Sequence, residues 1–236
     1  MNLSNILFID IETVPEKADF DELQTDMKEF WKIKGKYWIK DEVPDNGKAA
    51  ELYSEKAGIY SEFAKVICIA VGFINNKNGK QELRIKSFAG DDEKKLLTDF
   101  AELLNSKFDR PDKFMLCGHN IREFDIPFLS RRMIINNISL PELLKIAGKK
   151  PWEVQHIIDT MEMWKFGDFK NYTSLALLAT VLGIKSPKDD IDGSLVGKVY
   201  WETGDLERIV RYCEKDVRTV AQIYLRMNYL PMLEEI

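Results

Sequence analysis

The chain has 236 residues, which is enough to bury a full hydrophobic core and fits one domain with an insertion better than two domains. Its 45% apolar and 31% charged residues are ordinary for a globular protein, and no apolar run approaches the roughly 18 residues of a membrane span. The net charge of −5 argues against a protein that coats nucleic acid by electrostatic attraction alone.

The distribution of charged residues and cysteines along the chain narrows the class of protein further. Segment 110–150 has eight basic and four acidic residues, a local sum of +4 that either contacts phosphates or forms a solvated face. The three cysteines are widely spaced in apolar surroundings, which predicts buried thiols in a reducing cytosol and neither disulfides nor a zinc site. No positively charged stretch precedes the short apolar run that ends at Asp10, so we expect no signal peptide and a cytoplasmic protein without membrane contact.

Apolar periodicity predicts strands and helices in alternation along the chain. Residues 6–9 form a short apolar run typical of a buried strand, and the run 65–74 with the returning segment 81–88 predicts a hairpin. Further on, the patterns predict a helix over 91–105, a strand over 114–117, a helix over 126–135, a short strand near 157–158, and helices over 174–182 and 206–227. This order predicts an α/β fold in which helices flank a mixed sheet.

Residues 16–64 interrupt this alternation between the first strand and the hairpin. Apolar residues fall on one helical face over the first part of this segment: Phe20, Leu23, Met27, Phe30 and Trp31. Pro44-Asp45-Asn46-Gly47 then breaks the pattern. We therefore expect a mostly helical insertion, which either forms a lid or substrate wall or packs onto the edge of the core.

Two carboxylates, Asp10 and Glu12, follow the first predicted strand. Side chains at positions i and i+2 of a strand point to the same side, so these two acids emerge together. Their charges repel, and a divalent cation would remove the conflict, since Mg²⁺ favours one or two carboxylates together with phosphate oxygens of a substrate. The same pair also occurs in solvated loops, so this motif alone is a weak indication of a metal site.

Two further groups of polar residues lie later in the chain. Asn120 and Asp125 belong to a polar loop after the strand 114–117, where α/β proteins commonly place functional groups. Taken singly, Asp125 is better explained as a helix N-cap and Asn120 as a turn residue. Tyr212 and Asp216 lie one turn apart on the border of the apolar stripe of the last helix, where a side chain meets both the core and a cleft. The alternative for this pair is a boundary tyrosine beside a surface aspartate.

Together, the three groups resemble the motifs of the DEDD superfamily of 3′–5′ exonucleases, in the branch that carries a tyrosine. Asp10-Ile11-Glu12-Thr13 is similar to the first motif, Asn120 with Phe124-Asp125 to the second, and Tyr212 with Asp216 to the third. The likeness is greatest to the proofreading exonuclease domain of family B DNA polymerases, in its stand-alone bacterial form, and covers most of 5–14 and 65–228. It implies an RNase H-like mixed sheet flanked by helices, and a single 3′–5′ exonuclease domain over 1–236 with an insertion at about 16–64.

The resemblance also implies a site and a chemistry. It implies that four acids hold two Mg²⁺ or Mn²⁺ ions: Asp10, Glu12, Asp125 and Asp216. Asp10 would bridge the two ions. Tyr212 would orient the attacking water, a role that suits a neutral phenol, since its reference pKa of about 10 makes it a poor base at neutral pH. Three residues would contact the terminal nucleotide, with core packing as the alternative for the last: Thr13, Asn120 and Phe124.

The implied partner is nucleic acid. Likeness to proofreading domains favours release of nucleoside monophosphates from the 3′ end of DNA, with single strands preferred. An exoribonuclease is the first alternative, because a contact to the 2′-hydroxyl would separate RNA from DNA and no such contact can be located in this sequence. A module of the same fold that binds nucleic acid or protein without cleavage is the second, and a structural cation site is the third. The intact set of four acids and a tyrosine argues against the second alternative, and the third leaves Tyr212 and the ordered motifs unexplained.

Overall fold

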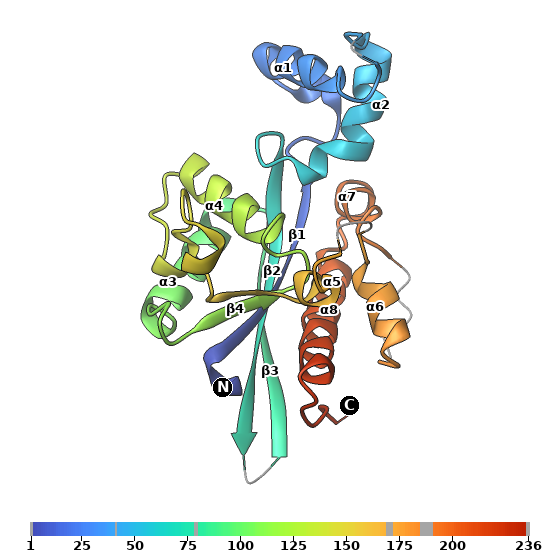
Figure 1. Ribbon diagram of the computed structural model, residues 1–236. Helices are drawn as coiled ribbons and strands as arrows, with labels where there is room; N and C mark the ends of the chain where they lie inside the picture. The colour runs from blue at the N-terminus through green and yellow to red at the C-terminus, as the bar shows by residue number, and fades with distance from the viewer. Residues whose placement is uncertain (1, 41, 78–79, 169–171, 185–190, 235–236) are drawn as a thin grey trace.

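The computed structural model describes residues 2–40, 42–77, 80–168, 172–184 and 191–234 (Figure 1). A five-stranded sheet runs through it in the order β3-β2-β1-β4-β5. The strands are β1 (Ile6–Pro15), β2 (Ala64–Lys77), β3 (Lys80–Ala89), β4 (Met115–Gly118) and β5 (Ile157–Asp159). Pairing is antiparallel from β1 to β3 and parallel from β1 through β4 to β5, which confirms the predicted mixed sheet. The sheet with its flanking helices is consistent with an α/β fold of RNase H-like type.

Helices lie against both faces of this sheet (Figure 1). One face packs against α3 (Glu93–Lys107) and α4 (Asp125–Ile135), and the other against α8 (Leu206–Met227). The remaining helical segments are α1 (Thr25–Gly35), α2 (Asn46–Lys56), α5 (Thr160–Lys165), α6 (Leu175–Val181), α7 (Val196–Lys198), the short turns η1 (Leu3–Asn5), η2 (Phe20–Glu22), η3 (Ala57–Ile59), η4 (Glu142–Leu144) and η5 (Pro151–Glu153), and the π-helical turn η6 (Val199–Thr203). Within the described residues, no helix has the length and apolar character needed to span a bilayer.

The main helices form where the local sequence patterns predict them. Asp92 accepts the backbone N–H of Lys95 at the start of α3, and Asp205 accepts that of Arg208 at the start of α8, so side-chain caps begin both helices. The first strand is longer than its apolar run of 6–9 predicts. It continues to Pro15 because β2 pairs with it along this whole length, past the charged residues where the apolar pattern stops.

The segment between β1 and β2 folds around its own aromatic cluster, and we call the described residues of 16–63 the α1–α2 lobe. Trp31 is fully buried there, with its ring edge-on against that of Tyr53, and its indole N–H donates to a backbone carbonyl of α2 (3.0 Å). Phe30 is instead 59% exposed. Because residues 20–22 form the separate turn η2, the single helical face expected from 20 to 31 is broken, and that prediction is wrong at Phe30.

A buried ion pair joins α3, α4 and the start of β2. Arg132 Nη2 lies 2.6 Å from Glu93 Oε2, and Arg132 Nε lies 2.8 Å from Glu93 Oε1. Arg132 also donates to the carbonyl of Ser61 (2.9 Å), and Glu93 accepts the backbone N–H of Val66 (2.8 Å). A phosphate contact, one of the two roles considered for the basic segment 110–150, is therefore wrong for Arg132.

Arg132→Met should lower the free energy of unfolding by about 3–5 kcal/mol, because it leaves the Glu93 carboxylate buried without its partner. Its exposed neighbour supplies a matched control, Arg131→Met, which should change that free energy by less than about 0.5 kcal/mol. Urea unfolding followed by circular dichroism measures both values. A loss below about 1 kcal/mol for Arg132→Met would show instead that apolar contact replaces the ion pair.

Candidate active site

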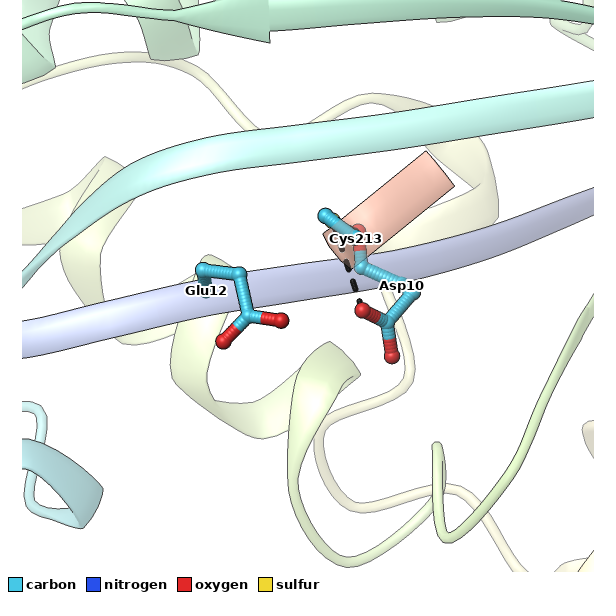
Figure 2. A group of neighbouring side chains, drawn as sticks. All are labelled: Asp10, Glu12 and Cys213. Carbon is cyan, nitrogen blue, oxygen red and sulfur yellow. Dashed lines mark hydrogen bonds between the residues drawn. The ribbon is translucent and has the colours of Figure 1, made fainter. Parts of the chain in front are cut away.

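The alternation of side chains along β1 places two carboxylates side by side. Odd-numbered apolar residues of β1 face α3 and α4, whereas Phe8 and Val14 belong to the core covered by α8. Asp10 and Glu12 take the positions between Phe8 and Val14, and both carboxylates extend from β1 on the same side (Figure 2). Glu12 is buried and Asp10 is half-buried. An apolar core face is thus interrupted by two adjacent acids.

Cys213 of α8 lies against this pair (Figure 2). Its thiol donates to Asp10 Oδ2 (3.3 Å) and to the backbone carbonyl of Asp10 (3.4 Å). The sulfur and one oxygen from each of Asp10 and Glu12 lie within 4.8 Å of one another, so these three residues could hold a metal ion. Burial raises the pKa of the Cys213 thiol, and the contact with Cys68 raises it further. The thiol therefore stays protonated and acts as a donor to Asp10.

Asp125 approaches this pair from the other layer of the fold, near enough for its charge to raise the pKa of Asp10 and of Glu12, but outside the group of ligand atoms that lie within 4.8 Å of one another. β4 pairs with β1 only as far as Phe8, so the next residues of β1 have an open edge on that side. Asp125 begins α4 at this edge, where its buried carboxylate accepts the backbone N–H of Ile11. Gly118, at the end of β4, permits the close approach of β4 to β1, since a Cβ there would lie 3.1 Å from the carbonyl oxygen of Ile9.

Asp159, at the end of β5, fixes the loop between β4 and α4. Its carboxylate accepts the backbone N–H groups of Asn120 (3.0 Å), Arg122 (3.1 Å) and Met161 (2.9 Å), and the last of these contacts caps α5. Asn120 has a left-handed backbone with φ of 61°, which asparagine tolerates better than most residues. Its Oδ1 is buried and has no hydrogen-bond partner within the described parts of the chain, which leaves an acceptor for a ligand.

Tyr212 and Asp216 approach from α8, on either side of Cys213 in sequence and one helical turn apart. The Tyr212 hydroxyl forms a hydrogen bond with the Asp216 side chain, and both residues are half-buried. Burial raises the pKa of Tyr212, and the charges of Asp216, Glu12 and Asp10 raise it further. The phenol is therefore neutral in the physiological range and acts as a donor to Asp216, not as a base.

Four carboxylates from three elements thus repel one another at a largely desolvated place. Burial raises the pKa of Asp10 and of Glu12 well above the usual range, and neighbouring charges, among them Asp216 and Asp125, raise both further. Burial raises the pKa of Asp125 to about 7, only partly offset by its hydrogen bonds. Oxygen donors in this number fit hard divalent cations such as Mg²⁺ or Mn²⁺, which would replace the protons and cancel the repulsion.

Two of the three residues predicted to contact substrate are engaged within the protein. The Thr13 hydroxyl donates to the carbonyl of Gly58 (2.7 Å), which ties β1 to the α1–α2 lobe one residue after the second acid. Phe124 is partly buried against the core beside α3 and α4, with its ring centre 5.4 Å from that of Phe128. This is the core position considered for Phe124. Asn120, with its unpartnered amide oxygen, is the best suited of the three to contact a ligand.

One aromatic residue at the site belongs to no motif. Tyr172 is 63% exposed, and its ring meets that of His119 edge-on with centroids 6.4 Å apart. Partial desolvation raises the pKa of Tyr172, and the charges of Asp125, Asp159 and Asp10 raise it further, so these carboxylates act electrostatically on its hydroxyl. Sequence reasoning missed Tyr172 because no spacing rule relates it to residues on β1 or α4.

Comparison with known proteins gives one family. Residues 59–233 match the family described as a predicted 3′–5′ exonuclease related to the exonuclease domain of PolB. No curated protein matches the chain. The matched stretch contains Asp125, Tyr212 and Asp216, whereas Asp10 and Glu12 precede it on the strand that pairs with β2 and β4. The chain belongs to this family of predicted 3′–5′ exonucleases.

Proposed function

We propose that this protein is a metal-dependent exonuclease that hydrolyses phosphodiester bonds from the 3′ end of single-stranded DNA and releases nucleoside monophosphates. The observation that carries the proposal is the convergence of four carboxylates and one phenol from β1, α4 and α8: Asp10, Glu12, Asp125, Asp216 and Tyr212. A structural cation site would account for the acids but not for the tyrosine hydroxyl bonded to one of them. The family supports the direction of cleavage, and the likeness to proofreading domains favours DNA.

The four acids are the residues that would hold two Mg²⁺ or Mn²⁺ ions. When bound, such ions lower the pKa of a water molecule and stabilise the charge of the leaving oxygen. The chain itself orients the carboxylates. The Cys213 thiol fixes Asp10, and the backbone N–H of Ile11 fixes Asp125. Neither contact occupies both oxygens of a carboxylate, so acceptor positions remain for a cation.

Tyr212 positions the attacking water in this proposal. Its hydroxyl donates to Asp216, which leaves a lone pair on the phenol oxygen that can accept a hydrogen bond from water. Because burial and the neighbouring acids raise its pKa, Tyr212 removes no proton, and its contribution is orientation. Asn120 and Tyr172 would contact the terminal nucleotide, the first through its amide oxygen and the second through its exposed ring.

We also propose that the chain is one exonuclease domain in which the α1–α2 lobe is an insertion. The family match begins at residue 59 and so leaves out both β1 and most of the lobe. The separate aromatic core of the lobe supports its treatment as an added unit. The Thr13 hydroxyl of β1 donates to the carbonyl of Gly58 in the lobe, and the backbone N–H of Glu16 donates to the carbonyl of Phe63 (2.9 Å), which pairs the first and last residues of the lobe next to β1. In this proposal the lobe forms one wall of the substrate site.

A time course on oligonucleotides of matched sequence tests the proposed activity. DNA and RNA strands labelled at the 5′ end are incubated with the full chain, with and without Mn²⁺. The expected result is a metal-dependent ladder in which DNA shortens from its 3′ end. Faster shortening of RNA would change the assignment to an exoribonuclease, and cuts at internal positions would exclude an exonuclease. Binding without shortening would indicate a non-cleaving module.

Mn²⁺ should raise the melting temperature, and by more at higher pH. The pKa of Asp125 is about 7 in the folded protein against an ordinary 3.8, so between these values the folded state holds a proton that the unfolded state has released. This contribution to stability is complete below the ordinary pKa and is lost as pH rises through about 7, while cations bind better as the protons leave. Thermal unfolding at about pH 5.5 and about pH 8, with and without Mn²⁺, measures the effect. Equal Mn²⁺ shifts at both pH values would contradict it.

Tyr172→Ala should raise KM for a DNA strand roughly tenfold and leave kcat within about twofold, because stacking of a base on an aromatic ring contributes about 1–3 kcal/mol. Tyr172→Phe keeps the ring and should behave like the wild type. Steady-state kinetics on a single-stranded substrate distinguish the two variants. A fall in kcat at unchanged KM for Tyr172→Ala would assign Tyr172 to the reacting centre instead.

A further inference from the structure

A basic helix face with exposed apolar side chains lies outside the site described above. α1 and the turn that follows it present Phe30, Ile33 and Tyr37, which are 59%, 54% and 85% exposed. Their spacings of three and four residues place them in one line. We call these three residues the α1 stripe. Trp31 and Gly35 lie on the opposite side of α1, toward the core of the lobe, so the stripe faces away from the protein.

Lysines frame the α1 stripe. From the start of α1 at Thr25 to residue 40, the chain contains five lysines and two acids, Asp26 and Glu29, a local sum of +3 in a chain whose net charge is −5. Two of the lysines have acidic partners nearby: Lys28 with Asp21 (3.8 Å) and Lys32 with Glu29 (3.0 Å). The other three form no ion pair with any residue that the structure describes: Lys34, Lys36 and Lys40. The Nζ atom of Lys34 lies 4.0 Å from the ring centre of Tyr60, which holds this charge beside the stripe.

We propose that the α1 stripe and its lysines bind the single-stranded nucleic acid whose 3′ end enters the active site. Aromatic rings stack on bases of any sequence, and lysines contact the phosphates, which together hold a strand without sequence preference. This inference rests on the proposed exonuclease function. It identifies the part of the protein that grips the strand beyond its terminal nucleotide.

The lobe stands at the end of the sheet where the site lies. β1, β4 and β5 are parallel, and their carboxyl ends lead to Asp10 and Glu12, to the loop before Asp125, and to Asp159. β1 continues from Glu12 to Pro15 over three residues, about 10 Å of extended strand, and then enters the lobe (Figure 1). A strand of several nucleotides is long enough to extend from the site to the lobe.

The positive charge around the stripe distinguishes among the partners that an exposed apolar stripe could bind. In a two-fold dimer the same patch would face itself and bring the lysines of both copies together, which is unfavourable. An anionic membrane surface would match the lysines, but the stripe has only three apolar side chains, which is little apolar area to bury in a bilayer interface. A polyanion with flat apolar bases matches both the lysines and the rings.

Fluorescence anisotropy with a labelled oligothymidylate of about 15 nucleotides tests this inference, with EDTA present to prevent cleavage. Phe30→Ala combined with Tyr37→Ala should weaken binding roughly tenfold or more. Lys34→Glu combined with Lys36→Glu should also weaken it and should lower its dependence on salt concentration. In the presence of Mn²⁺, both double variants should hydrolyse an oligonucleotide of about three residues like the wild type, because it is too short to reach the stripe.

Two matched controls should bind the long strand like the wild type. Tyr229→Ala removes an aromatic residue that is 97% exposed and lies two residues after α8. The carboxyl end of α8 lies at the opposite end of the molecule from α1 (Figure 1). Lys107→Glu reverses an exposed charge at the end of α3. A loss of strand affinity in either control as large as in the stripe variants would overturn the inference.

Unchanged affinity of both stripe variants for the long strand would also overturn it. If the stripe variants lost self-association, or binding to anionic phospholipid vesicles, but still bound the strand, the inference would be overturned as well. Hydrolysis distinguishes these outcomes from failure of the proposed function. A wild-type protein that releases no nucleotide from either oligonucleotide contradicts the exonuclease. Stripe variants that hydrolyse the long strand with the wild-type KM contradict only the strand grip.

Discussion

Asp10→Asn is expected to abolish nucleotide release and yet leave the metal-free protein at least as stable as the wild type. The substitution keeps the size of the side chain and removes a carboxyl group whose ionised form is disfavoured by burial and by the charges of Glu12 and Asp216. Loss of a cation ligand removes several kcal/mol of transition-state stabilisation, or roughly a thousandfold or more in rate. The metal-free melting temperature should stay equal or rise because a desolvated charge is gone, whereas the increase produced by Mn²⁺ should largely disappear.

Asp216→Ala removes the proposed ligand from α8 and should cause the same loss of activity. Glu207→Ala is its matched control, because Glu207 lies on the same helix with 92% of its side chain exposed, and it should change neither activity nor the Mn²⁺ shift. Release of a labelled mononucleotide and thermal unfolding measure the two properties on each variant. Activity near that of the wild type in Asp10→Asn or Asp216→Ala would contradict the assignment of the site.

Tyr212→Phe should slow nucleotide release by about a hundredfold or more while leaving the Mn²⁺ shift of the melting temperature unchanged. The ring stays packed against the core on the α8 side of the sheet, so only the hydroxyl and its hydrogen bond to Asp216 are lost. The expected loss appears in kcat, because an oriented water matters in the transition state and not for strand binding.

Tyr229→Phe controls for the loss of a phenol elsewhere on the surface, since Tyr229 is 97% exposed, and it should leave kcat unchanged. Single-turnover kinetics on a DNA strand at saturating Mn²⁺ compare the two variants. If Tyr212→Phe abolished the Mn²⁺ shift, the hydroxyl would be part of the cation site and its assigned role in orienting water would be wrong.

Much of the regular structure follows from local sequence because its causes are local. The apolar stripe of 206–227 and the cap at Asp205 produce α8, and a period of two along β1 places Asp10 and Glu12 on one side. Each of the three motif groups likewise lies within a few residues of one element. These patterns were sufficient to predict the mixed sheet with flanking helices and the exonuclease family, both of which are confirmed.

Contacts between distant parts of the chain were decided only by tertiary structure. Arg132 has the sequence context of a surface charge, but Glu93 lies 39 residues away in the chain and pairs with it in the core. Cys213 has the context of an apolar stripe, but the packing of α8 on β1 brings its sulfur to 3.3 Å from Asp10, across 203 residues. Such contacts depend on topology and on which faces pack together, and periodicity along the chain carries no information about either.

The sequence by itself therefore determined which residues carry the candidate chemistry and which elements present them. The tertiary structure decided how those elements meet. It placed Asp125 at the open edge of β1 and Tyr172 near the acids, and it left Phe30 exposed on α1. The physical reason is the same in each case. A side chain's neighbours are set by the packing of whole strands and helices, which is a property of the complete fold.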